Sequence, residues 1–214
     1  LYEEGYITYH RTDSVNLSEK FLGEAREYIA NTYGKQYLPE APRTFQTKSK
    51  VAQEAHEAIR PTDPTVTNDK VDGTGEINRD HKRLYELIWK RALSSQAREA
   101  IFDATTIEVK SSNGYLFEAK GSVIKFDGFL RIMGRVIDEL VIPAVAVGDE
   151  VKLKEAIPEE HFTSPPPRYT EASLVKALEE KDIGRTSTYA PIISTIQDRQ
   201  YVTRGQMRYY RIGA

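Results

Sequence analysis

The chain has 214 residues with 39% hydrophobic and 29% charged side chains, a composition typical of a globular protein. Its net charge of −2 gives no overall sign of nucleic-acid binding, and its lack of cysteine excludes disulfides and Cys-ligated zinc. No apolar run approaches the roughly 20 residues that span a bilayer, and no signal-peptide pattern begins the chain. Because Leu1 is not an initiator methionine and Ala214 directly follows a strand-like run, we expect a piece of a longer protein.

The first part of the chain is predicted to be mainly helical. An extended segment over residues 6–9 and a polar loop precede a helix that Ser18 caps and that Gly34 ends after Tyr33. Its apolar side chains recur at helical spacing and predict a buried stripe. The stripe consists of Phe21, Leu22, Ala25 and Ile29.

Two further helices are predicted in this part. One covers residues 50–59 and ends before Pro61. A polar loop over residues 62–78 separates it from a longer helix over about residues 80–100. The apolar face of the longer helix is assigned to Leu84, Leu87, Ile88 and Leu93.

The middle of the chain changes to a strand pattern. Residues 104–110 and 115–121 lie on either side of Ser112-Asn113-Gly114, a sequence that favours a tight turn and therefore predicts a β-hairpin. Further strands are predicted over residues 123–132 and 151–156.

The last part is predicted to hold two short helices and a terminal hairpin. The stiff connector Ser164-Pro165-Pro166-Pro167 leads to a helix capped by Thr170 and ended by Gly184. A second helix begins at Thr188, and a hairpin surrounds Arg204-Gly205-Gln206. The apolar face of the second helix consists of Tyr189, Ile192, Ile193 and Ile196. Helix-rich, strand-rich and again helical parts in this order predict an α+β fold.

A possible nucleophile lies near the start of the chain. Tyr9 and Arg11 are two residues apart in an extended segment, which sends both side chains to the same side. A phenol can attack a phosphodiester if a fixed cation stabilises the phosphate oxygens. The alternatives are a packing role for Tyr9 and a surface ion pair between Arg11 and Asp13.

His56 is the candidate in a second motif, residues 53–61. A histidine can donate to a phosphate oxygen or shuttle a proton. It has no partner at metal-ligand spacing, so no metal site is predicted. The alternative is a histidine on a helix surface between Glu54 and Glu57.

A third motif combines a glycine turn, an arginine, hydroxyls and a helix start. Arg185, Ser187 and Thr188 lie where free backbone N–H groups favour an anion, and Arg199 lies near the far end of the same helix. From Gly184 onward the chain holds five arginines against one aspartate, a local charge of +4. We predict an anion-binding site here. The alternatives are ordinary helix capping and, for the charge, a solvated basic hairpin at the chain end.

Together these motifs resemble the bacterial DNA topoisomerases of type IA over nearly the whole chain. The matching stretches are Tyr-x-Arg-Thr-Asp-Ser at 9–14, Glu-Ala-His-Glu-Ala-Ile-Arg-Pro at 54–61, Phe-Thr-x-Pro-Pro at 162–166, Glu-Ala-Ser-Leu-Val-Lys-x-Leu-Glu at 171–179, Gly-Arg-x-Ser-Thr-Tyr-Ala at 184–190 and Ile-Ile-Ser-Thr-Ile-Gln-Asp-Arg at 192–199. Their order and combination make the resemblance specific.

The resemblance implies that Tyr9 cleaves one DNA strand through a 5′-phosphotyrosyl link, with Arg11 and His56 at the phosphate. It implies DNA contacts from Arg185, Thr188 and Arg199. It also implies strand passage that relaxes negative supercoils without ATP, on single-stranded or negatively supercoiled DNA. A cytoplasmic, monomeric protein at the bacterial nucleoid is expected, with no membrane partner.

The resemblance further implies three parts of a toroidal core. Residues 1–95 would be the helical domain that bears the tyrosine, residues 96–169 a β-rich arch and residues 170–214 part of a DNA-channel domain. The Mg²⁺-binding Toprim domain of the family is absent from this sequence, so we expect no bound metal and little activity of this piece alone. Asp182 and Gln200 stand where the family commonly has glycine, which predicts positive φ angles there.

Two other functions remain open from the sequence. The chain could be a single-strand DNA-binding module in which Tyr9 is structural. It could also belong to another tyrosine-using class, such as a tyrosine recombinase or a type IB enzyme, which links to the 3′ end of DNA.

Overall fold

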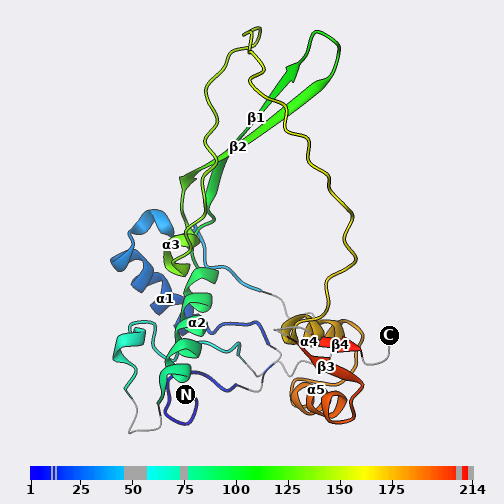
Figure 1. Cartoon of the computed structure of the whole chain (residues 1–214). Coiled ribbons are helices and arrows are strands. Elements are labelled where there is room, and N and C mark those ends of the chain that lie inside the picture. Colours follow the sequence, from blue (N-terminus) through cyan, green and yellow to red (C-terminus); the bar gives the residue numbers. More distant parts are fainter. Residues whose placement is uncertain (11, 13, 46–56, 73–76, 206–208, 212–214) are drawn as a thin grey trace. The chain divides into compact units, whose positions relative to one another are not determined.

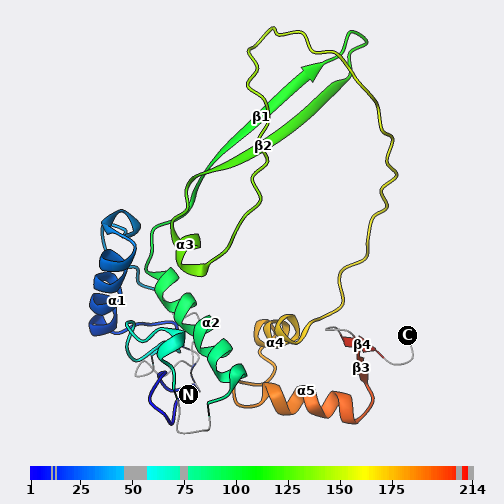
Figure 2. The ribbon, with the colours of Figure 1, turned by 60° about the vertical axis from the view of Figure 1, so that its left-hand side comes forward.

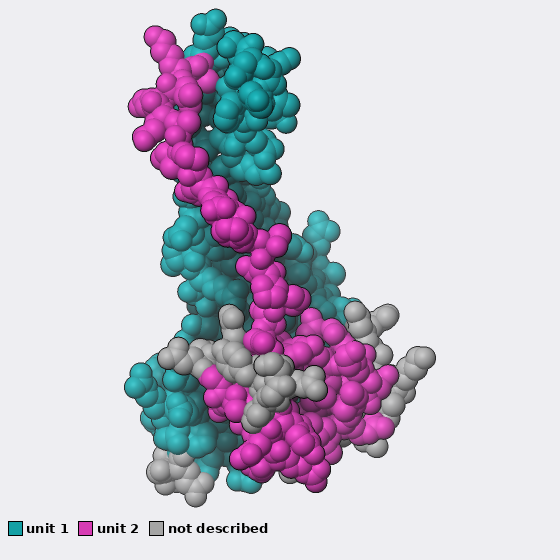
Figure 3. Space-filling model, turned by 45° about the vertical axis from the view of Figure 1, so that its right-hand side comes forward, with its two compact units in different colours: residues 1–150 teal, residues 151–214 magenta. Residues whose placement is uncertain are grey.

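A computed structural model describes residues 1–10, 12, 14–45, 57–72, 77–205 and 209–211, the last three as backbone only (Figure 1). Helices and strands are both present, which confirms the α+β prediction. Contacts divide the chain into two compact units, Leu1–Glu150 and Val151–Ala214 (Figure 3). The assignment of three domains stays a prediction. None of the described helices is both long enough and apolar enough to cross a bilayer.

Helix α1 (Glu19–Thr32) confirms the first predicted helix. The Ser18 hydroxyl accepts the N–H of Phe21, and thus satisfies one of the free donors at the helix start. Gly34 follows the helix with a φ of 105° and donates to the carbonyls of Ile29 and Ala30. The predicted stripe is buried along its whole length: Phe21, Leu22, Ala25 and Ile29.

Helix α2 (Arg79–Ser95) confirms the longer helix but not its predicted face or end. Leu84 and Leu87 are 49% and 59% exposed, so assigning them to the core was wrong. The buried face instead holds Tyr85, Trp89, Ala92 and Leu93. Tyr85 and Trp89 can be buried on this face because the polar group of each side chain forms a hydrogen bond.

The two buried aromatic groups of α2 donate to nearby loop carbonyls. The Tyr85 hydroxyl reaches the Val66 carbonyl at 2.7 Å, and the Trp89 ring N–H reaches the Pro64 carbonyl at 2.9 Å. The loop over residues 62–72 is thereby tied to α2, and it includes the short 3₁₀ helix η2 (Asn68–Lys70).

The helix α2 ends five residues earlier than predicted because Gln96 has other partners. Its buried side-chain amide accepts the N–H of Arg43 and donates to the Arg43 carbonyl. Its own N–H donates to the Leu93 carbonyl in a C-terminal cap.

The core of the first unit lies between α1 and α2 (Figure 2). Phe21, Ala25 and Ile29 share one buried cluster with the aromatic face of α2. The Tyr28 ring meets the Trp89 ring edge-on, with ring centroids 5.6 Å apart. The 3₁₀ helix η1 (Lys35–Tyr37) follows α1 and packs Tyr37 against this cluster.

A long two-stranded sheet extends from this helical part (Figure 1). Strand β1 (Ile101–Lys110) pairs antiparallel with β2 (Leu116–Phe126), and Lys110 opposite Leu116 closes the pairing at the predicted turn. The prediction of a hairpin is therefore confirmed. At the base of the hairpin, the Tyr37 hydroxyl donates to the Asp127 carboxylate at 2.7 Å. This hydrogen bond raises the pKa of Tyr37.

Three predicted elements differ from the structure. The strand expected over residues 123–132 ends at Phe126, and helix α3 (Phe129–Met133) follows it. Residues 151–156 form no strand, because no neighbouring strand in the described residues pairs with them. Residues 57–59 are not helical, since the Ala58 backbone forms hydrogen bonds with Asn16 and Thr8 in another segment of the chain. The rest of that predicted helix lies outside the described residues.

The second unit confirms the two short helices and the hairpin. Helix α4 (Glu171–Glu180) begins with a capping box between Thr170 and Ser173. Helix α5 (Tyr189–Asp198) follows Thr188. Strands β3 (Val202–Arg204) and β4 (Tyr209–Arg211) pair antiparallel.

Both helices of the second unit end in the same left-handed cap. After α4, Asp182 donates to the Glu179 carbonyl and Ile183 to the Leu178 carbonyl. After α5, Gln200 donates to the Gln197 carbonyl and Tyr201 to the Ile196 carbonyl, which is the same pattern. Asp182 and Gln200 have φ angles of 55° and 56°, which confirms the positive φ predicted for them.

Replacing Gln200 by glycine should stabilise the second unit by roughly 0.5–1 kcal/mol, because glycine adopts this φ without the clash of a β-carbon. Gln197→Gly is the matched control inside α5 and should cost about 1 kcal/mol. Denaturant unfolding of both variants measures the two changes. Equal destabilisation by both would contradict the strain at position 200.

Candidate active site and nucleic-acid interface

The segment that leads to Tyr9 is paired with the end of the second motif. The N–H of Thr8 donates to the Arg60 carbonyl at 2.9 Å, and the N–H of Thr62 donates to the Tyr6 carbonyl at 3.0 Å. Between them Ile7 and Pro61 form an antiparallel bridge. Two motifs that are far apart in sequence therefore lie side by side.

The Thr8 side chain adds two hydrogen bonds to this pairing. Its hydroxyl donates to the Ala58 carbonyl at 2.8 Å and accepts the N–H of Arg60 at 3.0 Å. The sequence analysis did not single out Thr8. The available signal was a β-branched hydroxyl residue directly before the candidate nucleophile.

Arg60 connects the same pairing to helix α1. Its side chain is only 13% exposed and forms an ion pair with Glu57 at 2.6 Å. The guanidinium also donates to the Pro61 carbonyl at 3.0 Å and to the Ser18 hydroxyl at 3.3 Å. It lies over the Phe21 ring, 4.6 Å from its centroid. The sequence analysis treated Arg60 only as part of a motif.

Tyr9 lies at the surface beside this anchored strand. It is 41% exposed, and its ring contacts that of Tyr2 edge-on at 5.4 Å and that of His10 at 5.5 Å. The Tyr9 residue is therefore partly exposed to solvent. Arg11 and His56 lie outside the described residues, so the expectation that they meet Tyr9 at a phosphate remains untested.

The third motif forms an exposed turn between α4 and α5. The Thr188 hydroxyl accepts the N–H of Arg185 at 2.8 Å and donates to the Arg185 carbonyl at 3.1 Å. Gly184 has a φ of 79°, and a β-carbon there would come within 2.7 Å of Ile192. The turn is thus closely packed on its inner side, while Arg185, Ser187 and Thr188 are all exposed.

Arg199 lies at the other end of α5 and not beside Arg185. A helix of ten residues is about 15 Å long. The two arginines therefore lie at opposite ends of α5. Arg204 has a protein partner, since it pairs with Glu171 at 3.3 Å.

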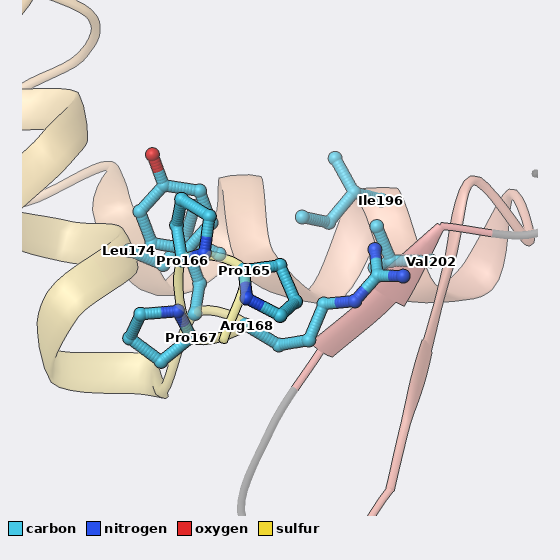
Figure 4. A pocket seen from close by; sticks show the side chains of 8 residues that line it. Pro165, Pro166, Pro167, Arg168, Leu174, Ile196 and Val202 are labelled. Carbon is cyan, nitrogen blue, oxygen red and sulfur yellow. The ribbon is translucent and has the colours of Figure 1, made fainter. Parts of the chain in front are cut away.

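An apolar hollow of about 500 Å³ lies between the proline-rich connector and the last helix and strand (Figure 4). Ile196 and Val202 line it, and Ile196 is one helical turn before Arg199. The other lining residues are Pro165, Pro166, Pro167, Arg168, Tyr169 and Leu174.

The described residues contain no group of three or more histidine or acidic side chains that could hold a metal ion. They therefore do not fit the Mg²⁺ that the resemblance implies for the family.

Comparison with known proteins agrees with the motifs. A family model described as DNA topoisomerase matches residues 1–212. The chain belongs to this DNA topoisomerase family. The topoisomerase resemblance is thereby confirmed.

Individual relatives cover almost all of the chain. It is 50% identical to DNA topoisomerase 1 of Vibrio cholerae and 47% identical to that of Haemophilus influenzae, over 98% of this chain and 24% of each relative. The full-length topoisomerase I structure from Thermotoga maritima matches 96% of the chain and 32% of its own, with 34% identity and a TM-score of 0.79. The chain thus spans about a quarter of the length of these curated topoisomerase relatives.

Replacing Thr188 by valine should loosen the turn at Arg185. The substitution keeps the shape but removes both hydrogen bonds to Arg185, at a cost of about 1 kcal/mol. Amide hydrogen exchange at Arg185 should then speed up about fivefold, while Thr188→Ser should leave it unchanged. Unchanged exchange in the valine variant would contradict the anchoring role of the hydroxyl.

Proposed function

We propose that this chain is the tyrosine-bearing part of a type IA DNA topoisomerase. The exposed Tyr9 phenol, on a strand fixed to the protein core, is the observation that carries the proposal. Membership of the topoisomerase family supports a DNA substrate. The alternative is a single-strand DNA-binding module in which Tyr9 is structural, and the Tyr9→Phe variant below distinguishes the two.

In the proposed reaction the Tyr9 oxygen attacks a backbone phosphorus of one DNA strand. The phenol loses its proton, a bond from oxygen to phosphorus forms, and the bond from phosphorus to the 3′ oxygen breaks. The leaving 3′ oxygen takes up a proton and becomes a free hydroxyl. Because one phosphoester replaces another, the reverse attack by the 3′ hydroxyl reseals the strand without ATP.

A neutral phenol is a weak nucleophile, so the attack needs assistance. We assign this assistance to Arg11, which would stabilise charge on the attacked phosphate, and to His56, which would donate to a phosphate oxygen. Mg²⁺ would be held by acidic residues elsewhere in the longer protein. We therefore expect the isolated chain to cleave DNA weakly or not at all.

The second unit would bind a single strand of the DNA. Arg185 and Arg199 would each contact a phosphate, with Ser187 and Thr188 as hydrogen-bond partners. About 15 Å of helix corresponds to about four phosphates at the 3.4 Å spacing of a duplex strand. A base could stack on the Tyr169 ring at the apolar hollow, which adds about 1–3 kcal/mol.

For the longer protein we propose relaxation of negatively supercoiled DNA by passage of the intact strand through the break. We place it in the cytoplasm at the bacterial nucleoid, as a monomer without a membrane partner. The division into a tyrosine-bearing domain over residues 1–95, an arch over 96–169 and a channel segment over 170–214 belongs to the same proposal.

Tyr9→Phe in the complete protein should abolish DNA cleavage and leave single-strand binding intact, because only the attacking oxygen is removed. Tyr2→Phe, which removes the neighbouring phenol, should still cleave. Oligonucleotides labelled at either end should show the protein attached to the 5′ end of the break. Attachment to the 3′ end would instead favour the tyrosine recombinase or type IB class.

The salt dependence of binding tests the interface. Log affinity for a single strand should fall with log salt at about −0.7 per neutralised phosphate, so Arg185→Ala and Arg199→Ala should each reduce the slope by about 0.7. Fluorescence anisotropy of a labelled oligonucleotide measures this. Arg83→Ala on α2 removes the same charge elsewhere and is the control. A slope equal to that of the parent in both interface variants would refute their contacts with phosphate.

A further inference from the structure

We propose that Arg60 is a positioning residue that sets where Tyr9 stands relative to the core of the first unit. The inference rests on the proposed role of Tyr9 as the nucleophile. It concerns a residue that the chemistry above does not use. The argument depends on where the Arg60 side chain is directed and on what its backbone holds.

The Arg60 guanidinium is directed into the protein and not toward a substrate. Only 13% of the side chain is exposed, and its donors reach Glu57, the Pro61 carbonyl and the Ser18 hydroxyl. One flat face lies on the Phe21 ring, which is itself fully buried. These contacts leave the cation little capacity to bind a DNA phosphate.

The Arg60 backbone holds the strand of Tyr9. Its N–H donates to the Thr8 hydroxyl at 3.0 Å, and its carbonyl accepts the N–H of Thr8 at 2.9 Å. Tyr9 is the next residue. A shift of Arg60 is therefore transmitted to the Tyr9 backbone through two hydrogen bonds and one peptide unit.

The side chain ties that pairing to the start of α1. Ser18 caps α1, and Phe21 is part of the buried stripe of the same helix. Arg60 thus contacts three parts of the first unit: the segment that leads to Tyr9, Glu57 and the start of α1. Glu57, the residue directly after His56, is held in the same cluster by its ion pair.

Lysine could not replace arginine here. The planar guanidinium directs donors to three separate groups while its face stacks on an aromatic ring. A lysine ammonium is a single point of charge and cannot do both. Arg60→Lys should therefore keep the charge but lose the geometry.

The test uses single-turnover cleavage by the complete protein with saturating oligonucleotide. A misplacement of about 1 Å can reduce a rate about 100-fold, so Arg60→Lys should cleave about 100-fold more slowly per folded molecule with unchanged affinity for the strand. Arg26→Lys is the matched control. Arg26 is a partly buried arginine on α1 whose side chain donates to the Pro39 carbonyl.

A rate equal to that of the Arg26→Lys control would overturn the proposal. A parallel loss of affinity would also overturn it, because Arg60 would then be a DNA contact. Tyr9→Phe separates this outcome from failure of the proposed function. If the phenylalanine variant still cleaves, the nucleophile is wrong whatever Arg60 does.

Thr8 provides a second test that leaves Arg60 in place, in case the lysine variant does not fold. Thr8→Val keeps the side-chain shape but removes the hydroxyl that accepts from Arg60 and donates to Ala58. It should slow cleavage, whereas Thr8→Ser should restore most of the rate with the same affinity for DNA. Equal rates for valine and serine variants would show that this connection does not position Tyr9.

Discussion

The first unit depends on one pairing, in which residues 6–8 lie against residues 58–62. Neither segment is part of a regular sheet, so a few hydrogen bonds and the Arg60 cluster hold them together. A largely buried guanidinium is tolerated only with partners, and Glu57, Ser18 and the Phe21 ring provide them. The same contacts that stabilise the charge therefore hold an exposed tyrosine beside the helical core.

Much of the fold could be predicted because local rules govern it. Helix α1, the hairpin and both helices of the second unit follow from caps, periodicity and turn residues. The buried face of α2 was missed because loop carbonyls far along the chain decide it, through Tyr85 and Trp89. The strand over residues 151–156 was predicted from alternation alone, yet a strand needs a neighbour, and pairing partners are not visible in a short window of sequence.

The candidate site was predictable where chemistry needs a particular residue type. Tyr9 stood out because a phenol, an arginine and a polar loop follow one another, and the family comparison supports the same motifs. Thr8 and Arg60 did not stand out, because their importance comes from contacts between distant segments. Arg185 precedes α5 and Arg199 follows it, and only the helix length of about 15 Å shows how far α5 separates the two arginines.

The central claim is that the oxygen of Tyr9 becomes esterified to DNA. It is tested most directly by trapping the cleaved complex of the complete protein, digesting it and locating the nucleotide adduct by mass spectrometry. The account predicts one modified peptide, with a 5′-linked nucleotide on Tyr9. An adduct on any other residue, including the neighbouring Tyr2, or a 3′-linked nucleotide would contradict it.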